Sequence, residues 1–173
     1  LLVDPAHKRQ GPFDVGMANG QVVEVEADLS PDRAREVYDA QGRLVFPVLV
    51  VSHVHIAPAP REVGLKMLAR AGVTLCLECG GFMDEVLTGI AKEGSGIQVA
   101  VLQRLDPGVS ISGPDAGRRE VTEFLEQSLK AGALGLKLLG GHFPLSPATT
   151  VAAIEEANRA GAYVAFHCGT SKN

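Results

Sequence analysis

Two histidines separated by a single residue are the feature of this sequence with the clearest chemical potential. His53 and His55 end a nearly continuous apolar run, residues 44–54. In a β-strand, residues i and i+2 point to the same face, so both imidazoles project to one side. Neutral imidazole is a good ligand for Zn²⁺ and similar ions. The pair therefore predicts a metal site at the end of a strand.

Two more residues with suitable chemistry lie in or after later apolar segments. His167 follows the apolar residues 162–166, and Lys137 is the only charge within residues 134–139. A buried lysine is costly unless it is paired or discharged. Lys137 can pair with a carboxylate such as Glu78, or act with a lowered pKa as a base or Schiff-base nucleophile. It can also react with CO₂ to give a carbamate, an anionic metal ligand, and the residues alone leave these alternatives open.

The remaining candidates are one histidine and two cysteines. His142 comes after Gly140-Gly141 and is predicted to lie on a loop, where it contacts a substrate rather than a metal. Cys76 and Cys79 form C-x₂-C, but an offset of three places them on opposite faces of a strand. A zinc knuckle also needs a second pair, which the sequence lacks. We interpret both cysteines as small buried residues, with Cys79 nearer the strand end.

The elements that must position these residues alternate along the chain. Apolar segments at 44–54, 73–77, 97–102, 134–139 and 162–166 alternate with predicted helices at 61–71, 83–93, 118–131 and 148–160. This alternation predicts parallel βαβ units, which fit either a doubly wound sheet or a (β/α)₈ barrel. The phosphate-binding pattern G-x-G-x-x-G is absent after the first strand, which weakens the dinucleotide-binding form of the doubly wound fold. In both folds the carboxyl ends of the strands build the site, so the candidates are expected to meet there.

The chain divides into a small β portion, residues 1–46, and an α/β portion, residues 47–173. Asn19-Gly20 between two alternating segments predicts a hairpin, and residues 36–38 are a further strand candidate. The second portion holds about five βα units of roughly 25 residues, whereas eight units need about 200 residues. We therefore expect either an open sheet or a barrel that this sequence leaves incomplete.

Composition excludes several classes of function. The 173 residues carry a net charge of −4 and are 46% hydrophobic, which is typical of a globular protein and argues against nucleic acid as the main partner. No apolar run reaches the length of a membrane span, so no membrane association is predicted. Three cysteines make no disulfide framework, and we expect a cytoplasmic protein, with homo-oligomerisation left open. The chain opens without Met, so its natural start is expected to be missing or removed.

Several segments together resemble the metal-dependent amidohydrolase superfamily, most closely the dihydroorotase, hydantoinase and N-acyl-amino-acid deacylase group. The first part of the likeness is Gly42-Arg43-Leu44-Val45-Phe46-Pro47, then His53-Val54-His55, then Ala71-Gly72-Val73-Thr74. The second part is Gly132-Ala133-Leu134-Gly135-Leu136-Lys137 and Phe166-His167-Cys168-Gly169-Thr170. The likeness covers nearly the whole chain. It implies the first five strands of a (β/α)₈ TIM-like barrel, preceded by part of a small β-sandwich.

The resemblance also implies a metal centre and a reaction. His53 and His55 match the ligands of the more buried metal, Lys137 matches a lysine whose carbamate bridges two ions, and His167 matches a ligand of the second metal. The implied cofactor is one or two ions of Zn²⁺ or a similar divalent metal. The implied reaction is hydrolysis of a C–N bond, in a cyclic amide or an N-acyl amino acid, by a metal-bound hydroxide. The expected partner is thus a small-molecule amide.

The sequence departs from the family pattern in places that matter for this reaction. Val48 and Val51 replace the glycine and aspartate of Pro-Gly-x-x-Asp-x-His-x-His. The family's sixth-strand histidine and eighth-strand aspartate are not in this chain, so the catalytic aspartate is expected beyond it and the 173 residues alone are expected to be inactive. Two alternatives remain: a non-catalytic homologue with a structural or assembly role, and a Schiff-base lyase that uses Lys137.

Overall fold

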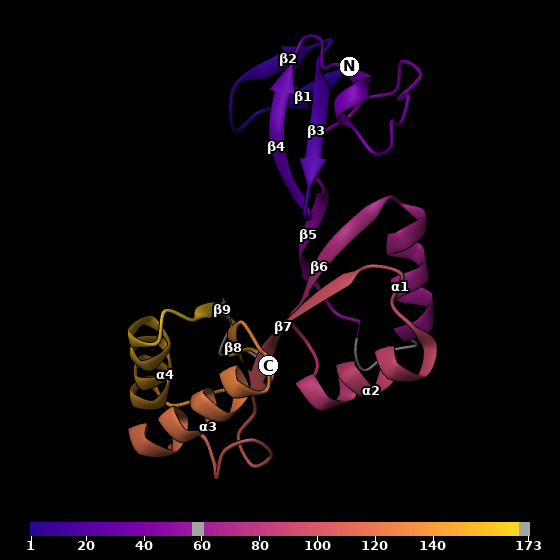
Figure 1. Cartoon of the computed structure of the whole chain (residues 1–173). Coiled ribbons are helices and arrows are strands. Elements are labelled where there is room, and N and C mark those ends of the chain that lie inside the picture. The colour runs from indigo at the N-terminus through magenta and orange to yellow at the C-terminus, as the bar shows by residue number, and fades with distance from the viewer. Residues whose placement is uncertain (57–60, 170–173) are drawn as a thin grey trace. The chain divides into compact units, whose positions relative to one another are not determined.

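The computed structural model describes residues 1–56 and 61–169. The chain forms two compact units, Leu1–Val48 and Leu49–Asn173 (Figure 1). Within the described residues, every helix is too short or too polar to cross a bilayer.

The first unit is built from short antiparallel strands. β1 (Leu2–Asp4) pairs with β2 (Arg9–Gly11), and β3 (Asp14–Ala18) pairs with β4 (Gln21–Glu26). The predicted hairpin at Asn19-Gly20 is confirmed: both residues have positive φ, 52° and 75°, as a tight two-residue hairpin turn requires. A short 3₁₀ helix, η1 (Pro31–Arg33), follows.

The strand predicted at residues 36–38 is wrong. The structure gives these residues irregular backbone, with Val37 and Tyr38 exposed by 64% and 83%. A short apolar segment forms a strand only where a neighbouring strand takes up its backbone hydrogen bonds, and these residues pair with none of the described strands.

The second unit contains the parallel sheet. Its elements in chain order are β5 (Leu49–Val54), α1 (Arg61–Arg70), β6 (Val73–Glu78), α2 (Met83–Glu93), β7 (Gln98–Leu105), α3 (Arg118–Lys130), β8 (Gly135–Leu139), α4 (Pro147–Arg159) and β9 (Tyr163–His167). The strands pair in the order β5-β6-β7-β8-β9, and every pairing is parallel. A doubly wound sheet reverses direction at a switch point, whereas this order never reverses. The sheet curls as half of a TIM-like barrel (Figure 1), so the predicted fold class is confirmed.

One face of β8 packs into the apolar core of this unit, and Lys137 lies on the other face. Leu136 and Leu138 are fully buried against α3 and α4, in one cluster with Val121, Leu125 and Ala153. Because side chains alternate along a strand, Lys137 points to the face that these helices do not cover. In the sheet, Lys137 is the register partner of Arg104 on β7 and of Ala165 on β9.

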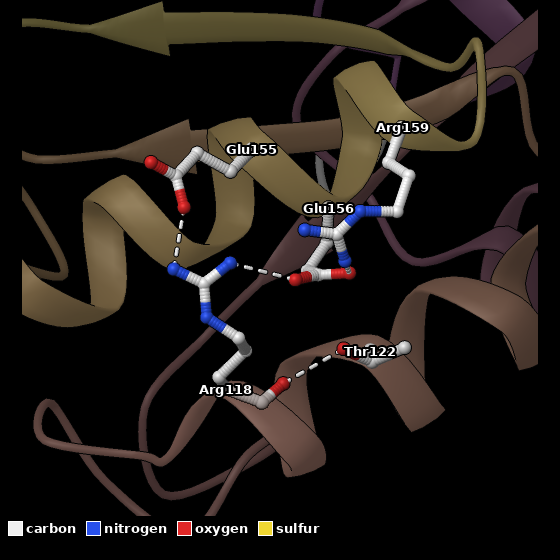
Figure 2. A network of polar contacts seen from close by, with 5 residues as sticks. All are labelled: Arg118, Thr122, Glu155, Glu156 and Arg159. Atoms are coloured by element: carbon white, nitrogen blue, oxygen red, sulfur yellow. Dashed lines mark hydrogen bonds and ion pairs between the residues drawn. The ribbon is translucent and has the colours of Figure 1, made fainter.

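Polar contacts fix α3 against α4 beneath this core (Figure 2). Arg118 on α3 donates to Glu155 and, at 2.7 Å, to Glu156 on α4. Glu156 is 4% exposed and also accepts from Arg159 one turn later. The two helices are thereby held in one register behind β8, the strand that carries Lys137.

Candidate metal centre

Three of the predicted site residues meet where the carboxyl end of β5, with His53 and His55, faces Lys137 in the middle of β8. The Nε2 atoms of His53 and His55 lie 3.2 Å apart, with the ring planes inclined at 63°. Nζ of Lys137 lies 3.4 Å from Nε2 of His53, although 84 residues separate the two in sequence. The side chain of Lys137 is 1% exposed. The structure thus brings the first and fourth strands of the sheet together through these side chains.

The spacing of the two imidazoles fits a shared cation. Two nitrogens bound to one tetrahedral Zn²⁺ at 2.0–2.1 Å are roughly 3.3 Å apart, close to the 3.2 Å between these Nε2 atoms. Within the described residues, however, no three His, Cys, Asp or Glu side chains are grouped closely enough to hold an ion. A protonated lysine is only a donor, so Lys137 cannot complete the set as an ammonium. As a carbamate it would present oxygens, and the donor set would then suit a divalent metal.

His167 lies at the end of β9 and faces a second histidine. The ring centroids of His142 and His167 are 5.5 Å apart at 64°. His167 is also near enough to His53 for its charge to lower the pKa of His53. The predicted ligand and the predicted substrate contact are therefore neighbours, and both are exposed.

The electrostatics of the pair favour the metal-binding form of imidazole. The pKa of His53 is lowered, first by partial desolvation of the ring and then by the nearby charges of Lys137, His55 and His167. The carboxylate of Glu78 acts in the opposite direction. Because only neutral imidazole binds a metal, a lowered pKa keeps His53 ready as a ligand at neutral pH.

Glu78 is a fully buried carboxylate at the end of β6. One oxygen accepts the N–H groups of Gly80 and, at 2.9 Å, Gly81, and the other accepts the N–H of Ile56. The pairing of Lys137 with a carboxylate such as Glu78 was one sequence-based alternative. Among the described residues, Nζ of Lys137 contacts His53 and forms no ion pair with Glu78. Glu78 accepts hydrogen bonds from the backbone next to His55 and from the loop after β6.

The two cysteines differ in their surroundings, as an offset of three predicts. Cys76 packs with Ile56 and Leu65 on the α1 side, and burial raises its pKa to about 11. Cys79 is buried just beyond β6, where burial raises its pKa and the charge of Lys137 lowers it. Both are therefore thiols at neutral pH and weak ligands without a metal to deprotonate them.

Arg104 lies near the site, and sequence reasoning did not single it out. It donates to the carbonyl of Gly80 at 3.1 Å and pairs with Asp106 at 2.9 Å. Its guanidinium lies over the rings of Phe82, at 4.2 Å, and Phe143, at 5.1 Å. It ties the loops after β6 and β8 to the end of β7. A charged residue within an apolar strand, the signal that identified Lys137, could have found Arg104 on β7.

The known proteins that this chain resembles include two dihydroorotases and an allantoinase. No family model matches the chain. It is 25% identical to the dihydroorotase of Sulfurihydrogenibium sp. and 27% identical to that of Lactococcus lactis subsp. lactis, in each case over 96% of the chain. It spans only 41% and 40% of those relatives. Over 71 residues, which are 38% of this chain and 15% of the relative, it is 41% identical to the allantoinase of Rubrobacter xylanophilus.

Two solved structures share the fold. A crystal structure of an uncharacterized protein matches with a TM-score of 0.60 and 20% identity, covering 90% of this chain and 50% of the other. A crystal structure of an amidohydrolase matches with a TM-score of 0.57 and 17% identity, covering 96% of this chain and 54% of the other. The dihydroorotase and allantoinase relatives, together with the fold shared with an amidohydrolase, support the predicted place of this chain in the amidohydrolase superfamily.

Proposed function

We propose that this chain supplies the metal-binding half of a site that hydrolyses the C–N bond of a cyclic amide or an N-acyl amino acid. The observation that carries the proposal is the meeting of His53, His55 and Lys137. The relatives named dihydroorotase and allantoinase support a cyclic amide as the substrate class. A small-molecule amide is accordingly the proposed partner.

In this proposal His53 and His55 hold one divalent ion, Zn²⁺ or a similar metal, through their Nε2 atoms. As a carbamate, formed with CO₂ and with release of a proton, Lys137 would join this set, and His167 would help to hold a second ion. When bound, such ions polarise an amide carbonyl and activate water. The loops that surround the pair are positioned by Glu78 and Arg104, and His142 beside His167 is placed to contact the substrate.

The burial of Lys137 favours the carbamate over the alternatives. An ammonium with 1% exposure and an imidazole as its contact is poorly compensated, whereas a carbamate between two cations is neutralised by them. The Schiff-base alternative uses the same lysine but leaves the histidine pair without a role.

Zn²⁺ titration of the chain, by competition with a chromophoric chelator, tests the metal site. We expect binding by the unaltered chain and its loss in the double variant H53A/H55A. H7A is the matched control, because His7 pairs with Asp4 in the first unit, far along the sequence from the site. Equal Zn²⁺ binding by all three proteins would refute the metal site and favour a non-catalytic homologue.

The reaction itself is tested on the whole protein that contains this chain. Ring opening of cyclic amides and deacylation of N-acyl amino acids are followed with and without a chelator. We expect chelator-sensitive hydrolysis that H53A/H55A abolishes. Borohydride trapping of a carbonyl substrate on Lys137 would instead identify the Schiff-base chemistry.

A further inference from the structure

The backbone around His55 is bonded to the end of β6 on both sides of the histidine. The carbonyl of Val54, the residue before it, accepts the N–H of Cys79 at 2.8 Å. The N–H of Ile56, the residue after it, donates to Oε2 of Glu78. The backbone is therefore hydrogen-bonded on both sides of His55, to Glu78 at the end of β6 and to Cys79 directly after it.

The imidazole of His55 also rests on a loop that the same carboxylate holds. The ring lies so close to Gly80 that a Cβ there would overlap its Nδ1. Oε1 of Glu78 accepts the N–H groups of Gly80 and Gly81, while Arg104 donates to the carbonyl of Gly80. Gly80 is thus fixed at both its N–H and its carbonyl, and the ring can turn toward it only as far as this backbone allows.

A fully buried carboxylate is expensive, because its charge is removed from water. Glu78 is 0% exposed, and among the described residues its three hydrogen-bond partners are backbone N–H groups, two from the loop after β6 and one from the segment after β5. Three such bonds to an anion are strong, charge-assisted ones. Together these bonds set the distance between the loop after β6 and the segment after β5, and His55 lies between the two.

We propose that Glu78 is a positioning residue that aims the imidazole of His55 at the point it shares with His53. The proposal rests on the proposed function, because aiming is useful only if the pair binds a metal. Among the described residues, the hydrogen bonds of Glu78 go to backbone N–H groups and not to either ring. Glu78 acts through the backbone of Ile56 and Gly80.

Glu78→Gln distinguishes the contact of Glu78 with Ile56 from its contacts with Gly80 and Gly81. The amide oxygen can still accept from Gly80 and Gly81, but the amide nitrogen would face the N–H of Ile56, donor against donor. We expect the Zn²⁺ affinity of E78Q to fall roughly 10- to 100-fold, the range for groups that orient metal ligands. Glu156→Gln is the matched control, since it alters a buried carboxylate between α3 and α4, and its Zn²⁺ affinity should match that of the unaltered chain.

Readouts that need no metal separate this proposal from the proposed function. In the metal-free chain, amide hydrogen exchange at Ile56 should be slow and should accelerate in E78Q, while the His55 ring signals change. If the unaltered chain binds no Zn²⁺, the proposed function fails, and these two signals still decide whether Glu78 holds His55. Unchanged Zn²⁺ affinity in E78Q, or fast exchange at Ile56 in the unaltered chain, would overturn the positioning role.

A second variant serves if E78Q does not fold. Gly80→Ala leaves Glu78 chemically unchanged and places a methyl group against the His55 ring, with its Cβ also 3.2 Å from Oε1 of Glu78. Its Zn²⁺ affinity should fall in the same way as that of E78Q. An affinity equal to that of the unaltered chain would show that the position of this ring does not depend on the loop that Glu78 holds.

Discussion

Replacing Lys137 by methionine distinguishes a buried ammonium from a metal ligand. The side chain is 1% exposed, and the contact of its Nζ within the described part of the chain is the His53 imidazole at 3.4 Å. Because the pKa of His53 is lowered, that imidazole is neutral at pH 7, so it can accept a hydrogen bond from the ammonium but brings no negative charge to balance it. The K137M side chain has a similar length and removes the charge without leaving a large cavity.

The expected sign of the stability change follows from this poor compensation. Replacing a buried ion pair by apolar residues of similar volume is often neutral or stabilising by about 1–4 kcal/mol, and among the described residues Lys137 has no ion-pair partner to lose. A gain of about 2 kcal/mol corresponds to a rise in Tm of roughly 4–8 °C for a chain of this size. We therefore expect K137M to be more stable than the unaltered chain without metal or bicarbonate, and to bind Zn²⁺ more weakly when bicarbonate is present.

Thermal unfolding by circular dichroism and Zn²⁺ titration, each with and without bicarbonate, measure these two changes. K130M is the control, since Lys130 is an exposed lysine at the end of α3 and should change neither quantity. A K137M chain that is less stable in metal-free, bicarbonate-free buffer would refute the reasoning, because Lys137 would then have favourable partners as an ammonium. Zn²⁺ binding that bicarbonate does not alter in the unaltered chain would refute the carbamate.

Three further predictions concern the core, the helix contact and the ligand pair. Leu136→Ala removes a fully buried side chain and should lower the free energy of unfolding by about 2–5 kcal/mol in urea; a loss below about 1 kcal/mol would contradict the packing described. The hydrogen bond from Arg118 lowers the pKa of Glu156 in the folded chain. The stabilisation from this contact is therefore present above the ordinary glutamate pKa and is lost as the pH falls through the lower folded value. Glu156→Gln should flatten that part of the plot of unfolding free energy against pH, and an unchanged plot would contradict the assignment. Since the pKa of His53 is lowered, its ring in the metal-free chain should titrate below about pH 6.5, the ordinary histidine value, when it is followed by NMR, and a midpoint above that pH would contradict the assignment.

The pattern of the sequence predicted the elements of the second unit closely. The helix predicted at 83–93 is α2 (Met83–Glu93), and those predicted at 118–131 and 148–160 differ from α3 and α4 by a residue at their ends. These segments have strong local signals, namely helical apolar spacing and, for α4, Ser146 followed by a proline in the first turn. Strand β7 runs to Leu105, beyond the predicted residue 102, because the apolar rule stops at the polar pair Gln103-Arg104.

The prediction of residues 36–38 as a strand failed for the opposite reason. Local preference there favours extended backbone, but a strand also needs a partner, and the choice of partner is not local. The same limit applied to the two folds left open by the βα alternation. Only the pairing order β5-β6-β7-β8-β9 distinguishes the curled half-barrel from a doubly wound sheet.

For the candidate site, the sequence alone determined the residue types and the strand ends that carry them. His53, His55 and Lys137 could be expected to meet because parallel strands direct their carboxyl ends to one edge. Tertiary structure decided the 3.4 Å contact between His53 and Lys137, the pairing of His142 with His167, and the burial of Glu78 beneath His55. These depend on sheet register and on backbone N–H groups of loops, which have no residue signature, so only the folded chain reveals them.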